Sequence, residues 1–125
     1  MLFRSTVVSF GFKYGVPVDA DIVLDVRFLP NPFWEPQLRP LTGEDASVSE
    51  YVLDSPDAQA FLANATALIQ TIAAGYLREG KRYVTIALGC TGGQHRSVAM
   101  AIELARRMGE LEIPAGVVHR DVGRE

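Results

Sequence analysis

Cys90, Arg96 and Ser97 stand at a spacing that could support phosphate chemistry. Five residues separate the cysteine from the arginine, and the serine follows directly. An arginine guanidinium can bind two phosphate oxygens at once, and a serine hydroxyl can hydrogen-bond a neighbouring thiolate. A thiolate held in this way could attack phosphorus while an aspartic acid protonates the leaving oxygen. The same residues could also bind a phosphate without cleaving it.

The Cys-x5-Arg-Ser spacing resembles the phosphate loop of protein tyrosine phosphatases, and Gly93 also fits that pattern. Two features favour binding over hydrolysis. Gly89 precedes the cysteine where those phosphatases commonly carry histidine, and the best candidate acid, Asp25, lies far upstream. Another alternative is that Cys90 is a small buried residue at a strand end. We therefore predict a phosphate-binding loop, with a hydrolase using Cys90, Arg96 and Asp25 as the alternative.

The surrounding residues predict a strand, a glycine-rich turn and a helix. Tyr83–Leu88 is a short apolar, β-branched run typical of a strand in a parallel sheet. The turn 89–96 contains three glycines, and Ser97 is predicted as the N-cap of a helix that runs to Met108. Backbone N–H groups at a helix N-terminus favour anions. This segment is therefore the first place to expect a phosphorylated ligand.

Three further strands and two further helices are predicted around this segment. Arg4–Phe10, Ile22–Val26 and Gly116–Arg120 have strand patterns, and a proline-rich loop follows the second of them. The 47–50 segment matches a capping box and predicts a short helix through Leu53. Ser55 followed by a proline predicts the start of a long helix, with Gly80 as its C-terminal cap. The apolar residues expected on its buried face are Phe61, Leu62, Ala65, Leu68, Ile69 and Ile72.

Alternation of strands and helices predicts a single α/β domain with a mostly parallel sheet and helices on its faces. In such sheets the ligand lies beyond the carboxyl ends of the strands. Three segments should meet there: the 11–15 turn, the 25–27 segment with its proline-rich loop, and the 90–97 segment. The prediction requires the second strand to run parallel to the third.

Several polar and aromatic residues in these segments are candidates for a site. Asp25 and Arg27 could act on a ligand or form a mutual ion pair. Lys13 could add positive charge or point to solvent, and His95, uncharged at a helix start, could hydrogen-bond a ligand hydroxyl. The loop residues Asn31, Phe33 and Trp34 could form a stacking wall for a sugar or base, although Trp34 is favoured as a plug of a minor core. His119 and Arg120 are weaker candidates near the C-terminus.

Composition narrows the function classes. The 125 residues are 48% hydrophobic and 22% charged, as expected for one small globular domain. No signal peptide or uninterrupted membrane-length apolar run is recognised, so we expect a cytoplasmic protein without membrane contact. One cysteine and two histidines make a zinc site improbable, and no metal or cofactor is expected. Residues 78–125 hold eight basic and six acidic side chains, which permits an RNA- or phosphate-facing surface.

Long motifs along the chain resemble the C-terminal domain of the RapZ/YvcJ family. They are SFGFKYGVPVDADIVLDVRFLPNPFW, RPLTG and GCTGGQHRSV, and the similarity runs from Val7 to the terminal VVHRDV. The resemblance implies a non-catalytic cytoplasmic adaptor that senses glucosamine-6-phosphate. It further implies binding of small regulatory RNA, its presentation to the endoribonuclease RNase E, and a homodimer or higher oligomer.

The resemblance also implies site residues. The phosphosugar pocket would involve the second strand and the loop after the third strand. Together with Asn31 and Ser97, the expected ligand-binding residues are Asp25, Arg27, Asn31, Cys90, Thr91, Gly92, Gly93, His95, Arg96 and Ser97. The residues expected at an RNA surface are Lys13, His119 and Arg120.

Three features depart from the family pattern. Residues 1–6 are too few to hold the preceding nucleotide-binding domain, and no GxxxxGK[ST] motif occurs, so 1–125 is expected to be one domain without ATP or GTP hydrolysis. Phe33 stands where the best-studied member has histidine. The terminal DVGRE lacks the basic tail that serves RNA binding in that member.

Overall fold

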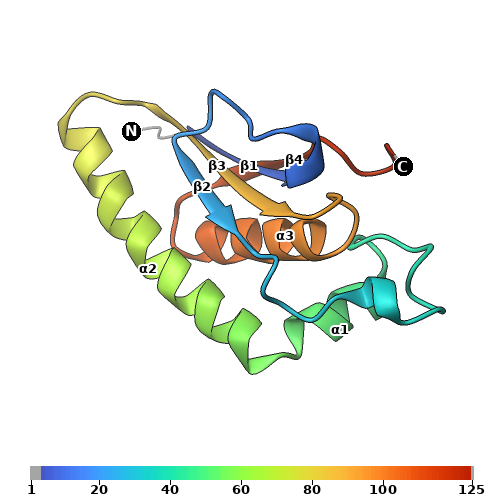
Figure 1. Cartoon of the computed structure of the whole chain (residues 1–125). Helices are drawn as coiled ribbons and strands as arrows, with labels where there is room; N and C mark the ends of the chain where they lie inside the picture. The colour runs from blue at the N-terminus through green and yellow to red at the C-terminus, as the bar shows by residue number, and fades with distance from the viewer. Residues whose placement is uncertain (1–3, 125) are drawn as a thin grey trace.

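Four parallel strands form one sheet, in the order β2-β3-β1-β4, in a computed structural model that describes residues 4–124 (Figure 1). The strands are β1 (Arg4–Gly11), β2 (Ile22–Asp25), β3 (Tyr83–Cys90) and β4 (Ala115–His119). The helices are α1 (Ala46–Leu53), α2 (Pro56–Arg78) and α3 (Arg96–Glu110), with 3-10 turns η1 (Phe12–Tyr14) and η2 (Pro32–Trp34). The predicted α/β class and the parallel pairing of the second and third strands are confirmed.

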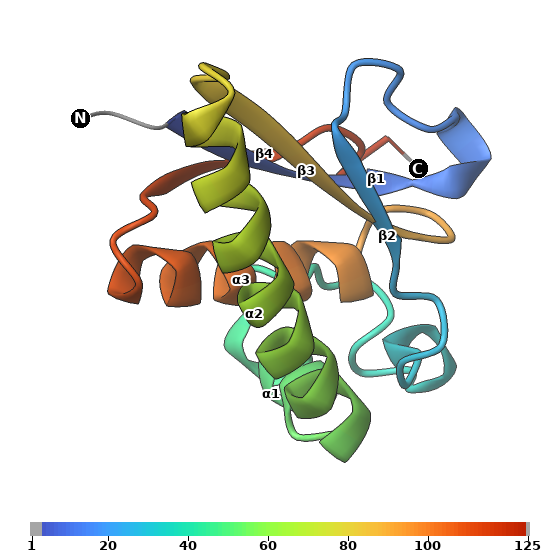
Figure 2. The same ribbon diagram turned by 90° about the vertical axis from the view of Figure 1, so that its left-hand side faces the viewer.

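All three helices lie on the same side of the sheet (Figure 2). The connections β2-α1-α2-β3 and β3-α3-β4 both move in one direction along the strand order. Right-handed crossovers that move in one direction place their helices on one face. The β1–β2 connection moves the opposite way and has no α-helix, so residues 12–21 run on the other side of the sheet. This turn therefore approaches the carboxyl ends of the strands from the side opposite α3.

The core lies between the sheet and the helices. Alternate residues of the strands face it, because side chains in a strand point to opposite faces in turn. Amphipathic α3 contributes one fully buried face to the core, and α2 contributes a stripe of buried residues at helical spacing. The central members are Val7, Val84, Ile86, Leu88, Met100, Leu104, Met108, Leu62 and Ile69. Leu68, predicted on the buried stripe of α2, is half exposed instead.

The predicted capping residues are confirmed for α2 but not for α1. Ser55 caps α2 by accepting a hydrogen bond from the Ala58 backbone at 3.0 Å, and Gly80 beyond its other end has a φ of +84°. The capping box predicted at Ser47 is wrong. Asp45 occupies the N-cap of α1, and its carboxylate accepts from Thr42 N at 2.9 Å rather than from the helix. The Asp45 side chain therefore stabilises the loop before α1 rather than the first turn of the helix.

Helix α2 is long and apolar enough to cross a membrane by length and composition alone, with a mean hydropathy of 1.3 over its most apolar window. The sequence prediction concerned an uninterrupted apolar run, which α2 is not, because polar residues such as Asn64 and Gln70 interrupt it. Helices of soluble cores pass the same test, and α2 packs on α1 and α3. The helix is therefore weak evidence for a membrane role.

Candidate functional site

The loop between β3 and α3 forms the centre of the site. Strand β3 continues to Cys90, two residues past the predicted end, because Gly89 and Cys90 still pair with Phe10 and Gly11 of β1. Ser97 is not the N-cap of α3, as His95 takes that position without a side-chain cap. The Ser97 hydroxyl instead lies 3.1 Å from Cys90 Sγ, and both side chains are buried. The predicted cysteine–serine contact is present in the structure.

Two glycines let the β1 and β3 ends meet. Gly93 has a φ of +80°, a conformation that side chains disfavour, and a Cβ there would lie 2.7 Å from Gly11 N. A Cβ on Gly11 would in turn overlap the backbone of Gly92. Gly93 is therefore required by the backbone of the loop, although it does not line the cavity described below.

Arg96 is buried at the start of α3, with 5% of its surface exposed. Its Nη1 donates to the carbonyls of Arg27 at 2.5 Å and Leu29 at 3.3 Å, and its Nη2 approaches Thr91 Oγ1 at 3.4 Å. These partners are neutral oxygens. Burial lowers the pKa of the guanidinium from its ordinary value, opposed by the nearby Cys90 and Asp25, but an arginine stays charged in proteins. A buried cation with neutral partners favours an incoming anion.

His95 joins the β3–α3 loop to the segment before α1. Its Nε2 lies 3.0 Å from the Arg39 carbonyl oxygen and must therefore carry the proton. Gly43 N donates to the Gln94 carbonyl at 3.0 Å, and Gln94 Nε2 donates to the Leu41 carbonyl at 3.2 Å. These bonds hold the proline-rich loop over the site. His95 Nε2 therefore helps to hold the proline-rich loop in place and is not available to donate to a ligand.

Asp25 and Arg27 form the mutual ion pair that the sequence left open. Arg27 Nη2 lies 2.7 Å from Asp25 Oδ2, with both side chains 47% exposed, and the guanidinium stacks 3.9 Å above the Phe12 ring. The hydrogen bonds from the Arg27 side chain lower the pKa of Asp25. Asp25 is therefore ionised at neutral pH, and neither residue lines the cavity. This arrangement does not suit a general acid.

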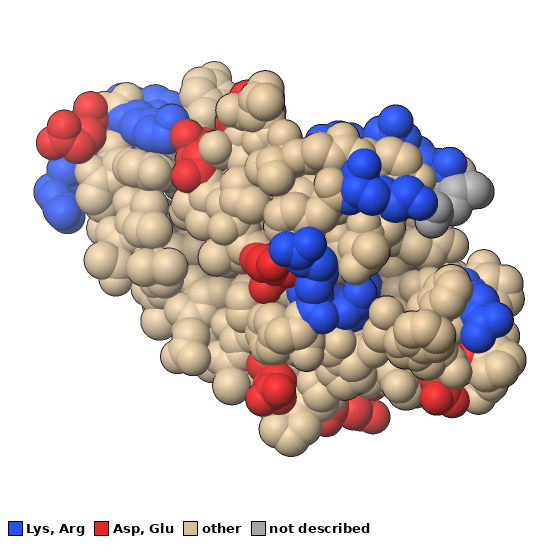
Figure 3. All heavy atoms as spheres, viewed as in Figure 1, with Lys and Arg blue, Asp and Glu red and all other residues tan. Residues whose placement is uncertain are grey.

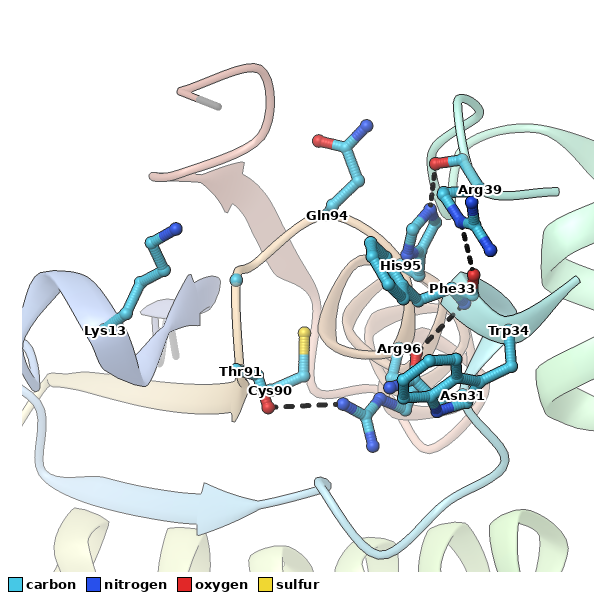
Figure 4. Close-up of a pocket in the computed structure, with 11 residues that line it drawn as sticks. Lys13, Asn31, Phe33, Trp34, Arg39, Cys90, Thr91, Gln94, His95 and Arg96 are labelled. Atoms are coloured by element: carbon cyan, nitrogen blue, oxygen red, sulfur yellow. Dashed lines mark hydrogen bonds between the residues drawn. The ribbon is translucent and has the colours of Figure 1, made fainter. Parts of the chain in front are cut away.

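A cavity of about 510 Å³ opens in front of the loop (Figure 4). Seven residues of the predicted ligand and RNA sets line it: Lys13, Asn31, Cys90, Thr91, Gly92, His95 and Arg96. The predicted members outside the lining are Asp25, Arg27, Gly93, Ser97, His119 and Arg120. Phe33, Trp34, Arg39 and Gln94 complete the wall. The predicted convergence of the 11–15, proline-rich and 90–97 segments is confirmed.

Arg39 and Gln94 are lining residues that sequence reasoning missed. Arg39 lies in the RPLTG segment, and Gln94 lies between the glycines and His95, so both had a positional signal in the motifs. The prediction of Trp34 as a minor-core plug is wrong, because 70% of its surface is exposed. Buried Pro32 anchors η2 at its other end, which leaves the tryptophan outside.

His119 is the last residue of β4 and Arg120 follows it, and neither residue lines the cavity. His119 Nδ1 lies 2.7 Å from Ser9 Oγ, and burial lowers the pKa of its imidazole. Arg120 Nη2 donates to the Gly15 carbonyl at 2.6 Å and to the carboxylate of Asp121 at 2.7 Å. Asp121 is fully buried and also accepts from Gly11 N at 2.7 Å. This second network ties the C-terminal segment to the end of β1.

A family described as the RapZ C-terminal domain matches residues 3–123. The chain belongs to this family. This RapZ C-terminal domain is similar to curated proteins called nucleotide-binding proteins. It is 63% identical to one from Streptomyces coelicolor, 60% to one from Nocardioides sp. and 59% to one from Frankia alni, each match covering 98% of this chain. The matches cover 41%, 40% and 42% of those relatives, so the chain spans about two fifths of their length.

Proposed function

We propose that this RapZ C-terminal domain is a non-catalytic regulatory domain that binds a phosphosugar, glucosamine-6-phosphate, in the cavity in front of α3. The observation that carries the proposal is the buried Arg96 beside an open loop, with neutral oxygens as its hydrogen-bond partners. The phosphate would bind to this guanidinium and to the Thr91–Gly92 segment. The names of the relatives, which describe nucleotide binding by those proteins, support a phosphorylated ligand of this general kind.

The cavity suits a ligand of this size and polarity. Its volume of about 510 Å³ lies in the range of small-molecule sites. Two amide side chains, Asn31 and Gln94, and the hydroxyl of Thr91 can hydrogen-bond sugar hydroxyls, while Lys13 and Arg39 add positive charge to the rim. The amino group of the sugar would be read by Asp25 only if this carboxylate exchanged its Arg27 partner.

Calorimetric titration of the purified domain with glucosamine-6-phosphate tests the proposal, with glucose-6-phosphate and inorganic phosphate as controls. We expect micromolar affinity for the amino-sugar phosphate, about −8 kcal/mol, and weaker binding of inorganic phosphate. Equal weak responses to all three compounds would reduce the site to a general anion loop and contradict the proposal.

The proposal assigns Cys90 no catalytic role, and Cys90→Ser tests that assignment. A serine hydroxyl can replace the thiol in the contact with Ser97, so we expect glucosamine-6-phosphate affinity within about threefold of the parent. We expect neither protein to hydrolyse p-nitrophenyl phosphate. Turnover by the parent that disappears in Cys90→Ser would instead establish the cysteine-dependent phosphatase alternative. The Asp25–Arg27 pair speaks against that alternative, because it keeps Asp25 ionised, and within residues 4–124 no acid lines the cavity.

We further propose that the domain acts as a cytoplasmic, oligomeric adaptor that contacts small regulatory RNA and RNase E. Its supporting observation is a cationic surface beside the cavity, seen as blue side chains over the upper right of Figure 3. Three cationic residues gather at residues 13–15. Lys13 belongs to η1 and its Nζ lies 5.3 Å from the Tyr14 ring, Arg124 Cζ lies 4.2 Å from the same ring, and Arg120 donates to the Gly15 carbonyl.

RNA binding through this surface is expected to weaken steeply with salt and to lose affinity in Lys13→Ala. Filter binding of a structured RNA at two salt concentrations measures both effects, and sedimentation at matched concentrations gives the oligomeric state. Salt-independent binding, or binding unchanged by the substitution, would contradict the assignment of Lys13, His119 and Arg120 to an RNA surface.

A further inference from the structure

Two aromatic side chains stand exposed at the cavity wall, directly beside the Arg96 site. Trp34 is 70% exposed and Phe33 is 46% exposed, and both line the cavity. Their rings meet edge to face, with centroids 5.3 Å apart and planes at 87°. Figure 4 shows Trp34 beside Asn31 and Arg96, on the opposite side of the cavity from Lys13. We define Phe33 and Trp34 as the aromatic wall.

Several contacts hold the aromatic wall in place before any ligand binds. Asn31 Oδ1 accepts from Phe33 N at 3.1 Å and caps the η2 turn, in which Pro32 occupies the first position. Arg39 Nε donates to the Phe33 carbonyl at 2.6 Å, and its guanidinium lies 4.7 Å from the Phe33 ring centroid. A wall fixed in this way loses little conformational freedom when a ligand contacts it.

The arrangement separates two recognition elements within one cavity. The Thr91–Arg96 side supplies a cation and hydrogen-bond donors, whereas the Phe33–Trp34 side supplies flat apolar surface. An exposed tryptophan on a braced turn at a polar cavity is poorly explained by folding, because it leaves most of a large apolar side chain in water. Such a surface is suited to the apolar C–H face of a sugar ring.

We propose that Trp34 stacks on the sugar ring of the ligand while Arg96 binds its phosphate, so that the cavity selects ring-bearing hexose phosphates over phosphate alone. This inference rests on the proposed function and adds to it the residue that reads the ring. The contribution of such a stacking contact corresponds to an affinity change of about two- to tenfold. Inorganic phosphate and glycerol-3-phosphate, which lack a ring, should not use the aromatic wall.

The single tryptophan of the chain gives a direct optical readout, because Trp34 is one of the two residues of the aromatic wall. We expect glucosamine-6-phosphate to change the intensity and shift the emission of Trp34 to shorter wavelength, as water leaves the indole. Glycerol-3-phosphate and inorganic phosphate should leave the spectrum nearly unchanged even at concentrations that saturate calorimetric binding. This comparison isolates contact with the ring from contact with the anion.

Calorimetry on variants completes the test. Trp34→Ala is expected to weaken glucosamine-6-phosphate about two- to tenfold and to leave glycerol-3-phosphate unchanged, whereas Trp34→Phe should retain most of the affinity. Tyr83→Ala is the matched control, since Tyr83 is an exposed aromatic residue at the opposite end of β3. It should bind both compounds as the parent does.

The outcomes separate the two proposals. If calorimetry shows glucosamine-6-phosphate binding in the parent and equal binding in Trp34→Ala, with no spectral change, ring stacking is overturned and the phosphosugar function stands. If Trp34→Ala weakens both phosphate esters equally, the wall has no preference for a ring and the inference also fails. If the parent binds neither ester, the proposed function itself fails.

Discussion

Replacement of Arg96 by lysine is expected to lower the affinity for glucosamine-6-phosphate by about 100-fold, or about 2.7 kcal/mol. Lysine keeps the positive charge but loses the planar fork that can bind two phosphate oxygens while still holding a backbone carbonyl. The guanidinium presently spans the Arg27 and Leu29 carbonyls and Thr91, which a single ammonium group cannot reproduce. Calorimetric titration measures the loss.

The matched control is Arg106→Lys, a like substitution on the same helix. Arg106 lies on the surface of α3, where it pairs with Glu103 and Glu110. The Arg106→Lys variant should bind glucosamine-6-phosphate as the parent does. Thermal unfolding of Arg96→Lys must accompany the titration, because Arg96 also joins α3 to the segment after β2. A folded Arg96→Lys domain with parental affinity would remove Arg96 from the binding site.

Replacement of Asp121 by asparagine is expected to destabilise the domain by about 2 kcal/mol, because it removes the charge of a buried acceptor that three donors share. The Asp121 side chain is fully buried, and accepts hydrogen bonds from Gly11 N and from the Arg120 and Arg124 side chains. Chemical denaturation at neutral pH measures the change. Asp25→Asn is the control, since its half-exposed pair with Arg27 should contribute less than about 1 kcal/mol.

The same substitution should alter the dependence of stability on pH. Burial raises the pKa of Asp121, but the hydrogen bonds from Arg120, Gly11 and Arg124 together outweigh burial and lower it. A lowered folded-state pKa gives stability that is present above the ordinary value of 3.8 and lost as the pH falls through the folded-state value. We therefore expect the free energy of unfolding of Asp121→Asn to fall less than that of the parent below about pH 4. Parallel curves would contradict this assignment.

The elements and their convergence could be predicted from local patterns, whereas several side-chain roles could not. Short runs with strand patterns identified all four strands, and Ser55 before proline located the start of α2, because these signals depend on neighbouring residues alone. Ser97 shows the limit. Its type suits an N-cap, but the preceding loop places His95 there and turns Ser97 to Cys90.

The remaining features of the site depend on side-chain exposure and on contacts between residues far apart in the sequence, which local patterns do not show. A tryptophan is usually expected in the core because of its residue type. Only the burial of Pro32 at the other end of η2 explains why the Trp34 ring is exposed to solvent. Asp121 carries no local signal, because its partners include Gly11 at the other end of the sequence. The Asp25–Arg27 pair was one of two predicted alternatives, and nothing in the spacing of the two residues decides between them.

The strand order has a consequence for how the chain folds. The central strand β1 is the first to be synthesised, yet its partners come late: Arg4 pairs with Tyr83, and Ser5 with Ala115. Strand β2, its neighbour in sequence, pairs with β3 instead. No ladder of the sheet can therefore form until β3 has left the ribosome, and chains with such distant pairings fold slowly. During synthesis β1 therefore precedes both of its strand partners, and its two edges stay unpaired until those partners arrive.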